Sequence, residues 1–137
     1  MINQMIVRSL YRCIPALCLV LFLVSCEEKE RKPENTLKEA LEALERNDHD
    51  GYLKHVDMGD DMDAAKTAYM KDALRQHVGW RRSERAAVLS IDMIDAQMNG
   101  DSICTVYYQY SFADGTKEVG AQKMVRHGQE WKLRLRN

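Results

Sequence analysis

Cys26 is the residue whose type and setting point most directly to a chemical modification. It follows Leu-Val-Ser at positions 23–25 and closes an apolar run, residues 14–24, that begins after two arginines. This pattern is typical of a bacterial lipoprotein signal, in which a diacylglycerol group is attached to the cysteine thiol before the signal peptidase cuts beside it. The sequence therefore predicts a signal peptide at residues 1–25 and lipid attachment at Cys26.

Two other interpretations of the apolar run are weaker. A transmembrane helix needs about 20 apolar residues, and the run at 14–24 is much shorter. A plain secretory signal would not require a cysteine after its cleavage site. Two or more acyl chains give stable membrane binding where one gives only marginal binding. We therefore expect the chain to be anchored to the lipid membrane of the cell envelope, at the outer membrane.

The residues after the cysteine are charged and offer nothing apolar to bury. Residues 26–33 are predicted to be the lipidated cysteine and a solvated tether. The acidic pair Glu27-Glu28 resembles the export signals that move some lipoproteins of the Bacteroidetes to the outer face of their outer membrane. A plain spacer is an equal alternative, so the sequence leaves open a periplasmic or a surface-exposed location.

Length and charge bound what the mature chain can be. Without residues 1–25 the chain has 112 residues, enough for one domain with a single core, predicted at 34–137. It then carries 18 basic and 21 acidic residues, a net charge of −3. This balance gives no support to nucleic-acid binding.

Cys104 is the one cysteine left unmodified after export. Cys13 and Cys18 leave with the signal and Cys26 is acylated, so no internal disulfide can form. Because Cys104 lies in an apolar strand pattern, burial as a small hydrophobic residue is preferred to a reactive thiol.

Helical periodicity dominates the first half of the domain. Thr36 and Glu39 form a capping box that predicts a helix to about residue 46. Turn residues follow, and then a short helix that ends before Asp57. Asp63 is a plausible N-cap for a helix of four to five turns, ending at Gly79 and the arginines after it. Its predicted apolar stripe is Met70, Ala73, Leu74, His77 and Val78.

The second half alternates with a period of two. Four runs, 87–94, 103–112, 117–126 and 131–136, are separated by glycine-containing turns and predict an antiparallel meander. The apolar sets that begin at Cys104 and at Trp131 should both meet the core. Two clean two-residue turns would put these sets on opposite faces, so we expect at least one bulge or longer loop, which curves the sheet.

Helices followed by a curved meander that ends in Gly128-x-x-Trp131-Lys132 resemble small lipoproteins of the nuclear transport factor 2-like superfamily, the cystatin-like cone. The resemblance covers about residues 34–137 and also includes Asn47-Asp48 after the first helix and Asp114-Gly115 in the meander. It implies an α+β fold in which N-terminal helices pack on a four-stranded antiparallel sheet. The closest group is described as lumazine-binding-like, a domain of unknown function, and implies no activity. Related cones often dimerise through the sheet, which leaves a homodimer open.

Five residues are candidates for ligand binding inside such a cone, because aromatic rings and amides can contact a ligand and also hydrogen bond to it. Ordinary packing is the preferred interpretation of their pattern. The candidates are Tyr69, Tyr108, Tyr110, Gln122 and Trp131.

Other polar residues form weaker patterns. The four histidines are scattered without metal-ligand spacing, so neither a metal nor a cofactor is predicted. His55 and Asp57 suggest a dyad, but a solvated surface pair is preferred. The basic set Lys132, Arg134 and Arg136 is interpreted as a solvated sheet face rather than an anion or headgroup site. No catalytic residue is predicted.

Three classes of function remain. The preferred one is a non-catalytic envelope lipoprotein that binds a small ligand or an envelope protein. The second is a cone enzyme of the isomerase or dehydratase type, which would need a buried Asp or His that faces a Tyr. The third is a structural or assembly role, which a cone filled by Trp131, Met124 and aliphatic side chains would favour.

Overall fold

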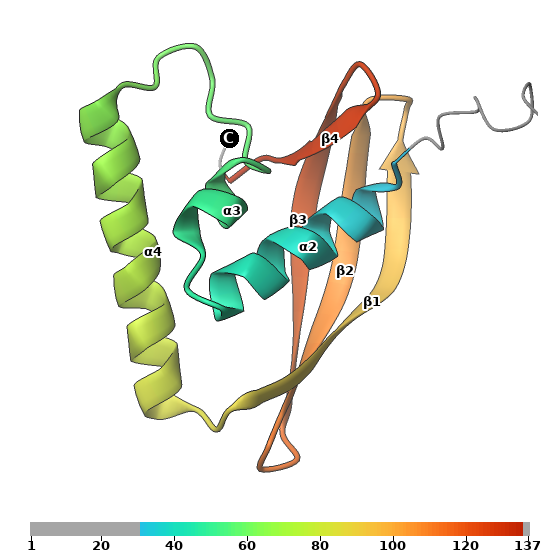
Figure 1. Ribbon diagram of the computed structural model, residues 1–137. Helices are drawn as coiled ribbons and strands as arrows, with labels where there is room; N and C mark the ends of the chain where they lie inside the picture. The colour runs from blue at the N-terminus through green and yellow to red at the C-terminus, as the bar shows by residue number, and fades with distance from the viewer. Residues whose placement is uncertain (1–30, 136–137) are drawn as a thin grey trace, which may run out of the picture. The chain divides into compact units, whose positions relative to one another are not determined.

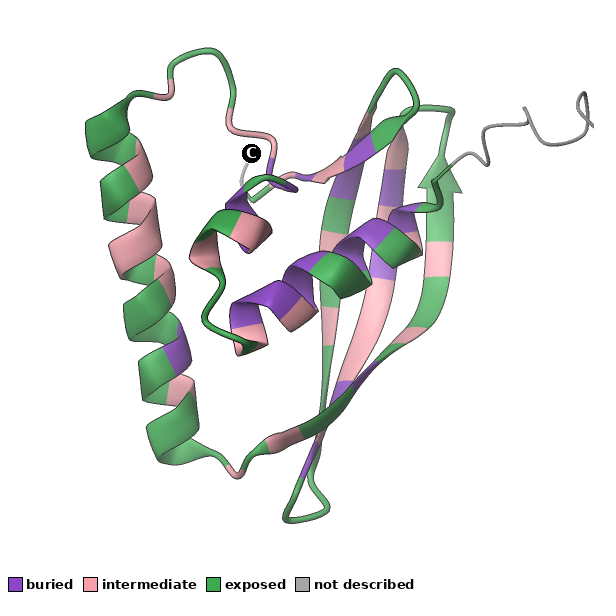
Figure 2. Ribbon diagram, viewed as in Figure 1, coloured by how far each residue is buried: buried purple, intermediate pink, exposed green. Residues whose placement is uncertain are grey.

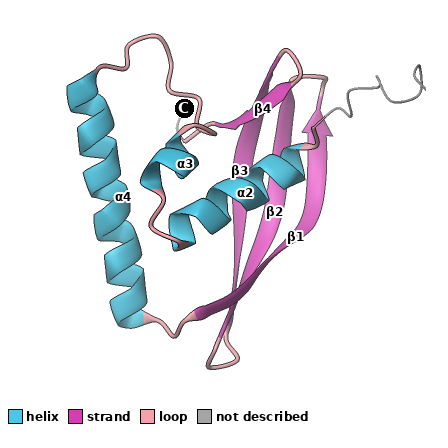
Figure 3. Cartoon of the chain, in the orientation of Figure 1, coloured by secondary structure: helices cyan, strands magenta, loops and turns pink. Residues whose placement is uncertain are grey.

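The computed structural model describes residues 31–135, so the predicted signal peptide and Cys26 lie outside the described residues. In this range the helices precede the strands, which confirms the predicted α+β architecture (Figures 1 and 3). The elements are α2 (Pro33–Glu45), α3 (His49–Leu53), α4 (Ala64–Glu84), β1 (Val88–Asn99), β2 (Ile103–Phe112), β3 (Lys117–His127) and β4 (Glu130–Leu133). No helix within residues 31–135 is long and apolar enough to cross a membrane.

Helix α2 begins earlier than the predicted capping box. Pro33 opens the helix, and the Thr36 side chain is buried within it instead of capping it. Proline suits the first helical position because its missing N–H has no partner there in any case. The apolar stripe of α2, which includes Leu37, Leu41 and Leu44, is buried against the sheet.

Helix α3 is a short helix, as predicted, but it lies earlier in the chain. It is capped by Asp48, whose carboxylate accepts a hydrogen bond from the Gly51 N–H at 2.9 Å. After it, Val56 forms a parallel bridge with Leu133, so the segment that was predicted as helix pairs with the last strand.

Helix α4 begins as predicted, with the Asp63 carboxylate accepting from the Lys66 N–H at 2.8 Å. It then continues past Gly79 to Glu84, because arginines of its last turns find acceptors on α2. Val78 is the one residue of α4 that is fully buried, and Figure 2 shows how exposed the rest of the helix is. His77, predicted on the apolar stripe, is exposed.

The sheet is an antiparallel meander in the order β1-β2-β3-β4. A five-residue connection separates the paired Ser111 and Lys117, and this longer loop puts Cys104, Met124 and Leu133 side by side on one face. Strand β1 is longer than predicted and carries two bulges, which increase its bend. The expectation of a longer loop or bulge is confirmed.

The core lies between this face and the helices. Met124, Leu133 and Cys104 are fully buried, and Trp131 is nearly so. Every residue of this core comes from residues 37–133, so the unit that starts at Arg31 carries its own core.

Candidate functional site

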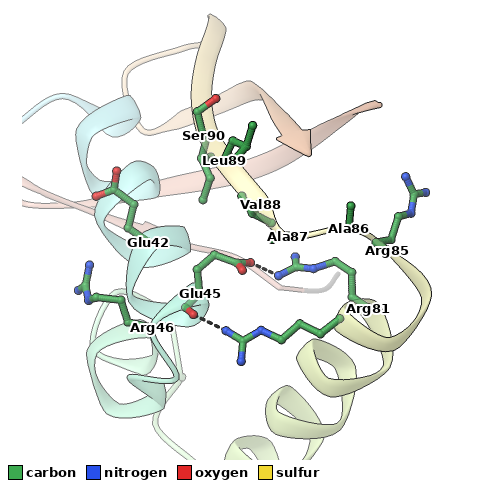
Figure 4. Close-up of a pocket in the computed structure, with 12 residues that line it drawn as sticks. Glu42, Glu45, Arg46, Arg81, Arg85, Ala86, Ala87, Val88, Leu89 and Ser90 are labelled. Carbon is green, nitrogen blue, oxygen red and sulfur yellow. Dashed lines mark hydrogen bonds and ion pairs between the residues drawn. The ribbon is translucent and has the colours of Figure 1, made fainter. Parts of the chain in front are cut away.

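A pocket lies where α2 ends, α4 ends and β1 begins (Figure 4). Its volume is about 620 Å³. We call it the arginine pocket, and its lining residues are Glu42, Glu45, Arg46, Arg81, Arg82, Arg85, Ala86, Ala87, Val88, Leu89, Ser90 and Ile91.

An ion pair between α2 and α4 forms one wall of the pocket. The Arg81 guanidinium donates to the Glu45 carboxylate, and the two side chains are only 12% and 18% exposed. Next to it, Arg82 donates to the backbone carbonyl of Glu45 and to Oδ1 of Asn47, the latter at 3.3 Å. These contacts satisfy a carbonyl at the end of α2 and hold the last turn of α4 in place.

Aromatic rings of β2 lie behind the arginines. The guanidinium of Arg81 is 5.0 Å from the centre of the Tyr110 ring, and that of Arg85 is 5.3 Å from the Phe112 ring. Arg85 also pairs with Glu118 at 3.1 Å. Cation–π contacts of this kind add to the energy with which the arginines are held.

The tyrosines near this wall keep their hydroxyl protons at neutral pH. Burial raises the pKa of Tyr52 to about 12. Burial also raises the pKa of Tyr108 and of Tyr110, although the nearby Arg81 opposes the shift in both. All three hydroxyls therefore stay protonated at pH 7.

The predicted ligand-binding residues have different places in the fold. Tyr110 and Trp131 are buried in the core, and Tyr108 is half-buried with its ring 5.7 Å from that of Tyr110. Gln122 donates to the backbone carbonyls of Lys123 and Arg134, so its amide links β3 to the residue that follows β4. None of them lines the arginine pocket.

Tyr69 does not lie inside the cone. Its side chain is 76% exposed on α4, because the neighbouring Met70 is on the side of the helix that packs against the core. The expectation that Tyr69 faces the interior is wrong.

Sequence reasoning missed Glu45 and Arg46, and interpreted the arginines after Gly79 only as a helix end. The signal available was an acid near the end of one helix and a basic cluster at the end of another. Only the tertiary structure brings them together.

A second, smaller pocket of about 210 Å³ surrounds His55. The His55 side chain is buried, and its Nε2 is 3.7 Å from Oε2 of Glu39. Burial lowers the pKa of His55, as does Lys54, while Glu39 opposes the shift. His55 therefore does not form the predicted solvated surface pair with Asp57.

Asp57 instead joins the ends of β3 and β4. Its carboxylate is 3.5 Å from His127 and 3.5 Å from Arg134. Burial would raise its pKa, but hydrogen bonds from His127 and Arg134 outweigh burial and lower the pKa. His127 thus contacts Asp57 in addition to ending a strand.

The interior of the cone within residues 31–135 is mostly apolar. The buried polar side chains within residues 31–135 are those of Thr36 and His55, and neither is a carboxylate. In the same range no three His, Cys, Asp or Glu side chains come together as a metal site would require. Met124, Trp131 and Leu133 fill the space between helices and sheet, and the arginine pocket lies at the edge of this core.

No family model matches this chain, and no curated protein matches it by sequence. Solved structures do match its fold. A Campylobacter jejuni protein described as a "Putative NTF2-like transpeptidase" superimposes with a TM-score of 0.65, covering 77% of this chain and 100% of its own at 14% identity. The domain has the nuclear transport factor 2-like fold.

Two further structures extend the comparison. A Shewanella oneidensis MR-1 protein, described as NTF-2 like and of unknown function, has a TM-score of 0.50 at 14% identity and covers 72% of this chain and 88% of its own. A SEC-C motif containing protein from Rhodopseudomonas palustris has the same TM-score and identity over 82% of each chain. At these identities the nuclear transport factor 2-like likeness establishes the fold alone.

Proposed function

We propose that this protein is a lipid-anchored envelope module that binds a small organic ligand in the arginine pocket and does not catalyse a reaction on it. The anchor rests on the signal pattern that ends at Cys26 and on the charged residues that follow it. The binding role rests on the pocket between α2, α4 and β1.

The single observation that carries the binding role is the pocket's size and lining. A volume of about 620 Å³ falls within the range of roughly 300–1,000 Å³ that is usual for ligand sites. One wall is a set of charged groups, and the other is formed by two alanines and by valine, leucine and isoleucine side chains at the start of β1. Such a combination of apolar surface and a few placed polar groups is what orients a small molecule.

The absence of catalysis is proposed because of how the pocket's charged groups are engaged. The Glu45 carboxylate is held in a partly buried ion pair with Arg81, so it is not free to accept a proton from a ligand. Glu42 is half-exposed and lies within 4.0 Å of Lys38. Both carboxylates are therefore engaged with cationic side chains of this chain.

Native mass spectrometry of residues 27–137 tests the binding role. We expect a small molecule to be retained from envelope extract by the unmodified protein. Ala87→Trp places an indole in the pocket and should abolish retention, whereas Ala68→Trp, at an exposed position of α4, should not. Equal retention by both variants would place the ligand elsewhere, and no retention from any extract would contradict the proposal.

Metabolic labelling with radioactive palmitate tests the anchor separately. Cys26→Ala should remove the label from the full-length chain, because the sulfur of Cys26 is the proposed attachment atom. Cys18→Ala, a cysteine within the signal, should keep the label. Unchanged labelling of the Cys26 variant would refute the anchor without affecting the binding role.

A structural or assembly role is the second candidate, and the filled interior of the cone favours it. Met124 and Leu133 are fully buried and fill the interior, so the pocket lies at the edge of the core. Failure to retain a ligand, together with a specific envelope protein crosslinked to the anchored chain, would support this role over ligand binding.

A further inference from the structure

We infer that the ligand of the arginine pocket is an amphiphilic anion, in which a carboxylate or phosphate group is joined to an apolar portion. The inference rests on the proposed binding function and adds the chemical class of the ligand. Three observations support this ligand class: the charge of the pocket, the partners of its arginines, and the apolar strand beside them.

The pocket has an excess of positive charge in a chain that is otherwise slightly acidic. Four arginines and two glutamates line it, whereas the whole chain has a formal charge of −1. The ends of α2 and α4 both contribute to the pocket, and each helix C-terminus carries roughly −0.5 of an elementary charge. These dipoles account for about one of the two excess charges, so roughly one positive charge remains for a ligand.

The partners of the arginines show where this charge lies. Arg81 is neutralised by Glu45, and Arg85 by Glu118. Arg82 donates only to neutral oxygens, the carbonyl of Glu45 and the amide of Asn47. Its charge therefore has no carboxylate partner among the described residues.

Arg46 also lacks a carboxylate partner within residues 31–135 and is exposed at the end of α2. A guanidinium presents parallel N–H groups that match the two oxygens of a carboxylate or phosphate. We therefore assign Arg82 as the main anion-binding residue and Arg46 as a second positive charge at the same site.

The opposite wall suits an apolar group. It consists of the first residues of β1, where the bulge between Val88 and Ser90 leaves Leu89 70% exposed. An alkyl or ring portion attached to the anion would cover this strand. Such contact makes affinity rise with chain length, by about two- to fourfold for each methylene that is buried.

The test is a titration of ¹⁵N-labelled residues 27–137, in which the amide signals of Ala86–Ile91 report on the pocket. The probes are octanoate, octyl phosphate, hexanoate, inorganic phosphate and the neutral octanamide. We expect saturable shifts with octanoate or octyl phosphate, weaker binding of hexanoate and of inorganic phosphate, and little binding of octanamide. Preference for octanoate would indicate a carboxylate ligand, and preference for octyl phosphate a phosphoester headgroup.

Variants locate the anion. Arg82→Gln should weaken binding of the preferred probe at least fivefold and reduce its salt dependence, and Arg46→Gln should do so to a smaller extent. Arg75→Gln, an exposed arginine of α4 outside the pocket, should bind as the unmodified protein does. The Arg82 variant's own spectrum reports whether the fold is intact.

The outcomes separate this inference from the proposed function. Octanamide binding as tightly as octanoate, or unchanged affinity in Arg82→Gln, would overturn the anionic class while ligand binding stands. Retention of a neutral molecule that Ala87→Trp abolishes would do the same. No shift at Ala86–Ile91 with any probe, together with no retained mass, would overturn both.

Discussion

The partly buried ion pair between Arg81 and Glu45 should couple α4 to the rest of the domain energetically. The chain contains a matched control for it, the pair Arg85–Glu118, which joins the same two residue types near the same helix end. The side chains of the first pair are 12% and 18% exposed, and those of the second are 43% and 49% exposed. The comparison therefore isolates the effect of burial.

The expected size follows from the dielectric around each pair. Two unit charges 4 Å apart attract by about 1 kcal/mol in bulk water and by about 4 kcal/mol at the effective dielectric constant found near protein surfaces. We expect a coupling of about 2 kcal/mol for Arg81–Glu45, since some of the gain is lost to desolvation. Exposed pairs contribute about 0–1 kcal/mol, so Arg85–Glu118 should couple by less than about 0.5 kcal/mol.

Double-mutant cycles measured by urea unfolding would test this. One cycle uses Arg81→Met and Glu45→Gln, and the other uses Arg85→Met and Glu118→Gln. For a domain of this length each kcal/mol changes Tm by roughly 4–8 °C, so either single variant of the buried pair should lower Tm by about 10 °C. Equal coupling in the two cycles would refute the reasoning, because burial would then not determine the strength of the pair.

Three further predictions concern other parts of the domain. Burial lowers the pKa of His55 in the folded state, so the unfolded chain binds more protons below about pH 6.5. The free energy of unfolding should therefore fall as pH falls from there through the folded pKa. His55→Asn should flatten this part of a urea-unfolding pH profile. The thiol of Cys104 is fully buried and burial raises its pKa, so in residues 27–137 it should react with Ellman's reagent only after unfolding, and immediate reaction of the native protein would contradict its placement. In Gly120→Ala the added Cβ would lie 2.4 Å from Cζ of Tyr108, so this variant should lose about 1–3 kcal/mol of stability in the same urea assay, while Val119→Ala on the exposed face should lose less than about 0.5 kcal/mol.

The order and type of the elements could be predicted from the sequence because they depend on local patterns. The N-cap at Asp63 and the alternation from Ile103 to Phe112 are contained within a few residues, and both match the structure. Other helix ends depend on contacts with residues that are distant in the sequence. Pro33 opens α2 before the expected cap, and Arg82 keeps α4 helical beyond Gly79 by donating to α2.

The candidate site could not be predicted in the same way. Glu45 and Arg81 are 36 residues apart, and no local signal says that the ends of two helices meet beside the first residues of β1. The tyrosines that the alternation selected belong mainly to the core. Tyr69 showed no pattern that separates an inward from an outward position, because α4 buries so little of its surface.

The sequence by itself predicted the signal at Cys26, the α+β class and the curvature of the sheet. Each follows from covalent chemistry or from a repeat of two or 3.6 residues. Only the tertiary structure decided that the interior is filled and that the charged groups gather at its edge. The reason is that a pocket is the space left after distant segments pack, and this space depends on side chains that are not neighbours in sequence.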